Sequence, residues 1–333
     1  MVNSNKTKVK SPGPAPKEAV DYIKNKGWKP GFDYRDVWGE EHAVAFTVAK
    51  ATQLDVLQSI RAEVERAIED GITLRQFQKD LTPTLQTLGW WGQKNEVDPL
   101  TGEIKNVQLG SPRRLKTIFD VNCRTARAAG QWQRAERTKA ALPYLLYQIG
   151  SAKKHRPEHV SWNGTLLSID DPWWKTHMPP LGYNCHCHVR QVSAPERSKL
   201  METGIPNPLA PDEINPETGL RTGRRVKQTV PVQTEAPPVK YVDWKNKRTG
   251  QTIKVPEGIT PGFDNNPGKA RLKNISQMLA GKLASMDTNI AQVAMRDIVS
   301  SSAFTALGEG ALLQEAYKLL GRAEVEKLRE KIK

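Results

Sequence analysis

Apolar residues repeat with a helical period near the start of this chain. Over residues 44–68 they recur mostly at steps of three and four, and Gly71 follows in the position where glycine commonly ends a helix. Thr73 is expected to begin a second, shorter helix that ends near Pro83, because proline interrupts a helix. These signals predict a mainly helical N-terminal region.

A longer helical pattern starts at Ser111, where serine can cap the helix and the next residue is proline, and it is expected to run to Ala141. Apolar residues between Leu115 and Ala129 share one face of this helix. The other face carries five cationic residues: Arg113, Lys116, Arg124, Arg127 and Arg134. Two interpretations stay open for these cations, a solvated helix face and a surface that contacts DNA or an acidic partner.

The pattern then changes to that of a small sheet. Residues 144–149 form an apolar run rich in strand-forming residues, which Gly150 ends, and residues 189–192 alternate as a second strand that could pair with the first. Earlier in the chain, a turn at 98–102 predicts a hairpin. After residue 270 the spacing becomes helical again and stays so to the C-terminus.

These patterns predict an α+β fold with a mainly helical N-terminal region, a small mixed α/β module that holds a His/Cys motif, and a helical C-terminal region. The expected regions are a flexible basic arm at 1–16, the helical N-terminal region at 17–110, the module at 111–195, a Pro/Gly-rich linker at 196–240, and a small Trp/Gly/Pro element with the C-terminal helices at 241–333.

Charge and composition narrow the function classes. The 333-residue chain carries a net charge of +14, and two tracts, 105–156 and 221–254, carry all of this excess, since the remainder of the chain is slightly acidic. Concentrated positive charge attracts phosphate polymers, so a nucleic acid partner is expected. No apolar run reaches the length that a membrane span needs, and three cysteines suit a reducing compartment better than a disulfide framework. The sequence therefore predicts an intracellular protein without a membrane partner.

The segment 159–188 concentrates the side chains that bind metal, because it holds four of the six histidines and two of the three cysteines. Cys185 and Cys187 are separated by one residue and, with His159 and His155 brought alongside by folding, could form a tetrahedral zinc site. His177 and Cys123 are further candidates for such a site. A metal-free arrangement, with buried cysteines and a hydrogen-bonded His159, is the alternative.

The same segment also allows two enzymatic interpretations. Histidines beside cysteines could activate a thiol nucleophile, but the sequence offers no recognisable oxyanion hole or orienting carboxylate. A metal-dependent nuclease is the stronger alternative, since clustered His and Asn on a basic protein suit phosphodiester cleavage, which needs a base for water and a cation at the phosphate. Asp170 and Asp171 would then ligate the cation, although Asp-Asp-Pro also begins a turn or short helix.

Five short motifs in this segment resemble, in order, the core of the phage Mu F-like head-morphogenesis proteins. They are Arg156-Pro-Glu-His159, Trp162-Asn-Gly164, Asp170-Asp-Pro-Trp-Trp174, His177-Met-Pro-Pro180 and Gly182-Tyr-Asn-Cys-His-Cys187. The start of the long helix at Ser111 is similar to the family as well, and the resemblance covers about residues 40–195. The ordered pattern is far more specific than any one motif.

The resemblance implies a minor head protein of a Mu-like phage or prophage, without enzymatic activity, that acts in procapsid assembly. It implies portal, capsid or scaffold proteins as partners, non-specific contact with packaged double-stranded DNA, and a place in the virion head after assembly in the host cytoplasm. The motif positions carried over are His159, Gly164, Asp171, Trp174, Pro180, Cys185 and Cys187. The family commonly has arginine between the two cysteines, where this chain has His186.

Overall fold

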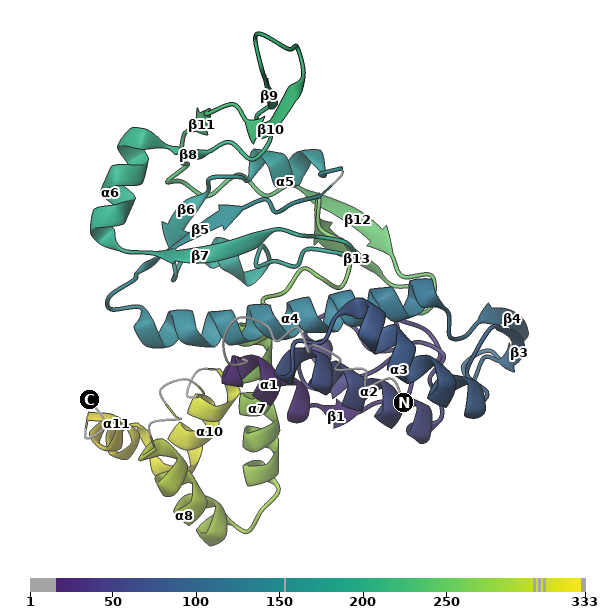
Figure 1. Ribbon diagram of the computed structural model, residues 1–333. Helices are drawn as coiled ribbons and strands as arrows, with labels where there is room; N and C mark the ends of the chain where they lie inside the picture. The colour runs from purple at the N-terminus through teal and green to yellow at the C-terminus, as the bar shows by residue number, and fades with distance from the viewer. Residues whose placement is uncertain (1–15, 153, 302–303, 305–306, 308–309, 331–333) are drawn as a thin grey trace, which may run out of the picture.

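The computed structural model describes residues 16–152, 154–301, 304, 307 and 310–330, so the arm predicted at 1–16 lies outside the described part except for Pro16. The fold is α+β, as the sequence predicts. One long helix, α4 (Pro112–Thr138), crosses the middle of the molecule, with a small sheet on one side and the N- and C-terminal helices on the other (Figure 1).

The remaining helices are short or of medium length. They are α1 (Lys17–Lys24), α2 (Leu54–Glu69), α3 (Leu74–Thr87), α5 (Pro157–Ser161), α6 (Ala194–Thr203), α7 (Pro267–Ala284), α8 (Thr288–Val299), α10 (Ala311–Leu320) and α11 (Arg322–Glu330), with the 3₁₀ helices η1 (Gly39–Ala43) and η2 (Pro172–Lys175). None of the helices in the described ranges combines the length and the apolar character needed to cross a membrane.

The strands form several small sheets. They are β1 (Gly27–Trp28), β2 (Ala45–Phe46), β3 (Gln93–Val97), β4 (Ile104–Gln108), β5 (Tyr144–Gln148), β6 (Leu166–Ser168), β7 (His188–Val192), β8 (Ile205–Pro206), β9 (Asp212–Ile214), β10 (Arg221–Arg225), β11 (Thr229–Val230), β12 (Tyr241–Lys245) and β13 (Thr252–Pro256). The hairpin predicted around 98–102 is confirmed as β3 and β4, and β5 and β7 pair antiparallel as expected, with β6 on the other edge of β5.

Helix α4 contributes to two hydrophobic cores. Its first half packs with α1, α2 and α3 in a cluster that we call the N-terminal core, which includes Ile23, Leu57, Ile60, Phe77, Leu81 and Leu115. Its second half packs under the three-stranded sheet in the module core, which includes Trp132, Tyr147, Ile149, Trp162, Trp173, Trp174, Cys185 and Ile259. The predicted helix is confirmed, with Ser111 accepting a hydrogen bond from the Arg114 backbone at its start and Thr138 as its last residue.

Two helix boundaries near the N-terminus differ from the predicted ones. The helical spacing over 44–68 becomes a helix only at Leu54, because residues 45–46 form β2, and buried Val48 imitates helical spacing from an extended segment. Helix α3 continues through Pro83 to Thr87, so its predicted end is wrong. Leu85, beyond the proline, is fully buried in the N-terminal core, and this burial favours the extra turn.

Residues 194–203 also differ from the irregular structure expected after the module, because they form helix α6. The Ser193 side chain accepts a hydrogen bond from the Glu196 backbone, and Pro195 lies in the first turn. Serine followed three residues later by glutamate is a known helix start. This signal was present in the sequence and was outweighed by the Pro, Gly and charged residues around it.

The C-terminal helices pack into a core of their own, and α7 joins it to the rest of the molecule. Asn266 caps α7 by accepting from the Gly268 and Lys269 backbones, and its side chain donates to the Trp174 carbonyl oxygen at 3.2 Å. Arg271 on α7 donates to the Tyr22 carbonyl oxygen on α1 at 2.7 Å. The helices predicted after residue 270 are thus confirmed, and the first of them contacts both other regions.

Gly130 lets α1 approach α4 closely. A Cβ atom there would lie 2.9 Å from the Ala19 backbone nitrogen, so α1 would have to move. We expect Gly130→Ala to lower the free energy of unfolding by about 1–3 kcal/mol, because overpacking outweighs the better helix propensity of alanine.

Gly281 in α7 provides the control, since a Cβ atom there meets no described atom within 4 Å. Gly281→Ala should raise the free energy of unfolding by up to about 1 kcal/mol, because only helix propensity changes. Equilibrium urea unfolding of both variants measures the difference. Equal effects at the two positions would contradict the close packing of α1 on α4.

Candidate metal centre

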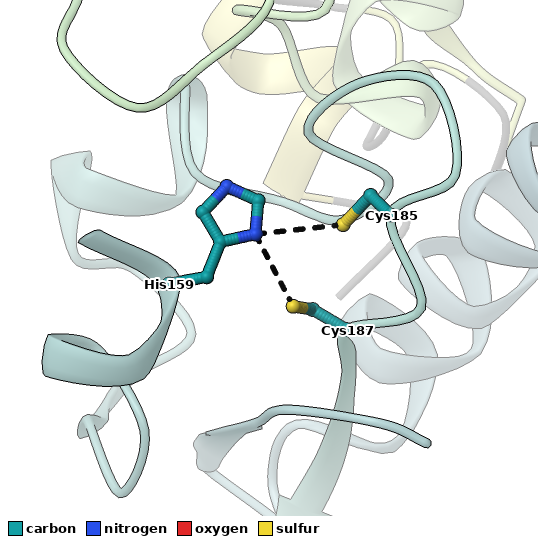
Figure 2. A group of neighbouring side chains, drawn as sticks. All are labelled: His159, Cys185 and Cys187. Carbon is teal, nitrogen blue, oxygen red and sulfur yellow. Dashed lines mark hydrogen bonds between the residues drawn. The ribbon is translucent and has the colours of Figure 1, made fainter. Parts of the chain in front are cut away.

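His159, Cys185 and Cys187 come together in the module core. The Nδ1 atom of His159 lies 3.4 Å from the Cys187 sulfur and 3.8 Å from the Cys185 sulfur, and all three side chains converge on one point (Figure 2). His159 and Cys185 are buried, and Cys187 is partly exposed. One imidazole nitrogen and two sulfurs within 4.8 Å of one another form a group that could hold a metal ion.

Local structure explains how each ligand reaches this point. His159 lies on α5, a short helix that begins at Pro157, and its ring is directed at Cys185 and Cys187 (Figure 2). Cys187 immediately precedes β7, and Cys185 lies in the tight loop before it, where Asn184 has a positive φ. Gly150, at the end of β5, leaves room for this loop, because a Cβ atom there would lie 2.0 Å from the His186 carbonyl oxygen.

A contact from far along the chain orients the His159 ring. Its Nε2 atom lies 3.0 Å from the Gly258 carbonyl oxygen, which can only accept, so Nε2 carries the hydrogen and donates. In the neutral ring this leaves the lone pair of Nδ1 directed at the two sulfurs. Histidines that ligate metals are held in this way, by donating their second ring nitrogen to a carbonyl or carboxylate oxygen.

Aromatic rings enclose the group. The Trp162 ring stacks on His159 with centroids 5.1 Å apart and meets the Tyr147 ring edge to face at 6.2 Å. Trp173 packs against Tyr147 and stacks on His177 at 4.3 Å. Such apolar walls lower the local dielectric and strengthen electrostatic interactions within the site.

The two cysteines are electrostatically coupled. A hydrogen bond from the Cys187 thiol holds the pKa of Cys185 well below its ordinary value, against the opposing effect of burial, and His159 lowers that pKa further. The Cys187 pKa is raised, because its proton is the one shared with Cys185. Burial and then the charge of these sulfurs raise the pKa of Tyr147. The arrangement therefore favours one thiolate, the form that binds metal.

Other predicted ligands lie apart from this group. The Nε2 atom of His155 is within hydrogen-bond distance of the Gly150 carbonyl oxygen, at 2.8 Å, and His177 is buried among the tryptophans with Thr176 as its hydrogen-bond partner. Cys123 is buried in the N-terminal core. His186 contacts Arg124 at 3.3 Å. The structure therefore joins His159, Cys185 and Cys187, and leaves His155 outside the group.

The motif residues that are not ligands have structural contacts. Gly164 has a φ of +91° and lies against the Pro231 backbone, and Asp171 caps η2 by accepting from the Trp173 backbone. Trp174 is fully buried and donates from Nε1 to the Ser168 carbonyl oxygen at 2.9 Å, while a cis peptide bond joins Pro179 and Pro180.

Neither aspartate of the predicted nuclease site joins the group. Asp170 is exposed and pairs with Lys139, the residue that follows α4, and Asp171 is the cap described above. Among the described residues, no carboxylate lies with His159 and the two cysteines as a further ligand. The cation-binding role weighed for Asp170 and Asp171 therefore has no geometric support at this site.

Four of the five cations predicted on one face of the long helix are exposed, and the fifth is partly buried. Arg113, Arg127 and Arg134 are exposed, Lys116 is exposed and pairs with Asp120, and Arg124 is partly buried beside His186. The helix crosses the middle of the molecule, so protein covers much of its circumference.

Three residues of the site were missed from the sequence. Gly258 contributes only a backbone oxygen and is distant in sequence from His159, so no motif marks it. Tyr147 was predicted only as part of a buried strand, and Trp162 only as part of a motif. Alternation along the strand places Tyr147 on the face of β5 that Leu145 and Ile149 share, which is the signal that could have suggested it.

Comparisons with known proteins agree on one family. The family model "Phage Mu protein F like protein" matches residues 58–190. Over 190 residues the chain is 46% identical to "Putative capsid assembly protein F" of Escherichia phage Mu. This alignment covers 57% of the chain and 42% of that protein. Over 152 residues it is 40% identical to "Mu-like prophage FluMu F protein" of Haemophilus influenzae, covering 46% of this chain and 36% of that protein.

The matched part of the chain thus spans about two fifths of the length of these relatives. The family match extends from within α2 to β7, so it contains His159, Cys185 and Cys187 and ends well before Gly258. No solved structure matches this chain.

Proposed function

Through residues 58–190 the chain belongs to the Phage Mu protein F like family, and on that premise we propose that it acts in head morphogenesis of a Mu-like phage or prophage. The observation that supports this most strongly is the 46% identity to a protein named for capsid assembly. In this proposal the chain is a non-enzymatic minor head protein, present in the host cytoplasm during assembly and in the virion head afterwards.

The contacts of the motif residues support a structural role. Gly164, Asp171 and Trp174 act in a close backbone approach, a helix cap and a buried hydrogen bond. None of these contacts presents a nucleophile or a general base to solvent. We therefore propose that the motif maintains the shape of the module, which lies within the region predicted at 111–195.

Exposed apolar side chains suggest where portal, capsid or scaffold proteins bind. On α8, Ile290 and Val293 are more than half exposed, and on the β3–β4 hairpin Val97 and Ile104 are exposed as well. Both elements lie at the periphery of the molecule (Figure 1). We propose that these two surfaces contact head proteins, since exposed apolar side chains at such positions favour protein association.

The second basic tract suggests a DNA contact. Strand β10 and the residues after it are exposed at the end of the module opposite α4. Arg224, Arg225 and Lys227 form no ion pair within the described part of the chain. Unpaired cations on a projecting hairpin suit phosphate contacts without sequence reading. The exposed cations of α4, namely Arg113, Lys116, Arg127 and Arg134, lie away from this hairpin and are a second, separate candidate for phosphate contacts.

We also propose that His159, Cys185 and Cys187 bind zinc. Sulfur and imidazole ligands suit this ion, and the hydrogen bond from His159 to the Gly258 carbonyl oxygen directs the free nitrogen at the site. Zinc bound there would hold α5 against the loop before β7, and so contribute to the stability of the module.

Deleting the gene in the phage or prophage that encodes this chain should reduce the yield of DNA-filled heads, and the wild-type chain should restore it. The double variant Ile290→Glu, Val293→Glu should restore the yield of filled heads less well than the wild-type chain, because charge on the α8 surface disfavours an apolar contact. Lys318→Glu, on the exposed part of α10, is the control. Electron microscopy and sedimentation of lysates measure the yield, and normal heads without the chain would contradict the proposal.

Replacing Arg224, Arg225 and Lys227 by glutamine should weaken DNA binding equally for unrelated sequences. The slope of log affinity against log salt should fall by about 0.9 for each cation that contacts a phosphate. The matched control replaces Lys24, Lys273 and Arg296, which pair with acidic residues, and has the same change in net charge. Equal slopes for the two variants would count against this surface.

Elemental analysis of the purified chain should find one zinc ion per chain, and the Cys185→Ala, Cys187→Ala variant should lose it. Because the metal holds separate segments together, the variant should also unfold at a lower temperature. Cys123→Ala is the control, since Cys123 lies in the N-terminal core. A well-folded wild type without metal, even after reconstitution, would rule out the zinc site.

A further inference from the structure

The hydroxyl of Tyr147 is a buried polar group that the metal centre described above does not use. The Tyr147 side chain is fully buried, and its Oη atom has no partner that meets hydrogen-bond geometry among the described residues, although the Cys187 thiol, a weak donor and acceptor, lies near enough to act on it. Leaving a buried hydroxyl without a strong hydrogen-bond partner is unfavourable, because the group has lost its hydrogen bonds to water. Such a group in a folded protein usually has a bound water or ion as its partner.

Strand pairing directs this hydroxyl at the metal centre. Tyr147 pairs with Val189, and continuing the same register places Cys187 opposite Ile149. Tyr147 and Cys187 are therefore diagonal neighbours on one face of the sheet, within reach of an aromatic side chain. The electrostatic influence of the Cys187 and Cys185 sulfurs on the Tyr147 hydroxyl agrees with this placement.

Neighbouring rings hold Tyr147 in this position. Trp162 contacts the Tyr147 ring edge to face and stacks on the His159 ring, so one indole sets both side chains relative to each other. Trp173 packs on Tyr147 as well, with centroids 5.9 Å apart. The Tyr147 hydroxyl is therefore fixed beside the metal ligands.

The ligand set leaves one coordination position open. Zinc in proteins is usually tetrahedral, and sites with three protein ligands take water or substrate in the fourth position. Here the described residues supply one nitrogen and two sulfurs, with no further His, Cys, Asp or Glu beside them. Tyrosine is not among the usual zinc ligands, but its hydroxyl can hold a water molecule.

We propose that a water molecule fills the fourth position of this metal centre, and that the Tyr147 hydroxyl holds it by a hydrogen bond. The inference rests on the zinc binding proposed above. It makes the centre an open site within a structural module, able to exchange its water for a small anion. Cys187, the only partly exposed member of the three ligands, lies where solvent can reach the ion.

The test uses the full chain reconstituted with Co²⁺ without oxygen, because Co²⁺ replaces Zn²⁺ and its visible absorption reports its ligands. Azide should shift the wild-type spectrum as it replaces the water. Tyr147→Phe should weaken Zn²⁺ binding by about 10- to 100-fold, as is usual when a group that supports a metal ligand is removed. Tyr144→Phe, on the opposite face of β5, is the matched control and should bind Zn²⁺ like the wild type.

Each outcome decides between the two proposals. A wild type that binds neither Zn²⁺ nor Co²⁺ overturns the metal centre and with it the bound water. Metal binding with an azide-insensitive spectrum and equal affinities for the two variants overturns the water and leaves the zinc site standing. A cobalt spectrum with a tyrosinate charge-transfer band that Tyr147→Phe removes also overturns it, because Tyr147 would then be the ligand itself. If Tyr147→Phe folds poorly, the azide titration of the wild type still tests whether a water molecule occupies the fourth position.

Discussion

The fold depends on one helix, α4, that packs against the N-terminal helices on one side and the module sheet on the other. Helix α4 supplies Leu115 to the N-terminal core and Trp132 to the module core, so the two cores share a single rigid element. At Gly130 the absence of a side chain lets α1 approach, and Gly268 on α7 makes a similar approach to Trp132. Because α4 is rigid, α1, α7 and the sheet are positioned relative to one another through it.

The candidate metal centre depends on contacts between segments that are distant in the sequence. His159 is oriented by the Gly258 carbonyl oxygen, which follows the β12–β13 hairpin. That hairpin is held in turn by Arg248, whose buried guanidinium group pairs with Asp36 and Asp98 in the N-terminal region. The residues after β13 return to the module, where Ile259 joins its core. The module that contains the family motif is therefore completed by a segment outside the family match.

The contacts of the motif divide its residues into two groups. His159, Cys185 and Cys187 direct reactive atoms at one point, whereas Asp171 and Trp174 form hydrogen bonds that hold the surrounding loops. The His/Cys group is largely buried, and the residues that hold the loops around it are therefore part of the same motif. A ligand set enclosed by tryptophans needs every loop around it closed, since polar backbone groups left open there would be costly.

The sequence alone determined the features that depend on local physics. The long helix after Ser111, strands β5 and β7, the hairpin at 98–102 and the family motif all follow from spacing, capping and turn chemistry. Only the tertiary structure decided which histidine meets the cysteines, because His155 and His159 are equally plausible by spacing. It also decided that α3 continues past Pro83, through the burial of Leu85. Distant contacts such as that of Gly258 leave no local pattern, because a backbone oxygen is the same in every residue.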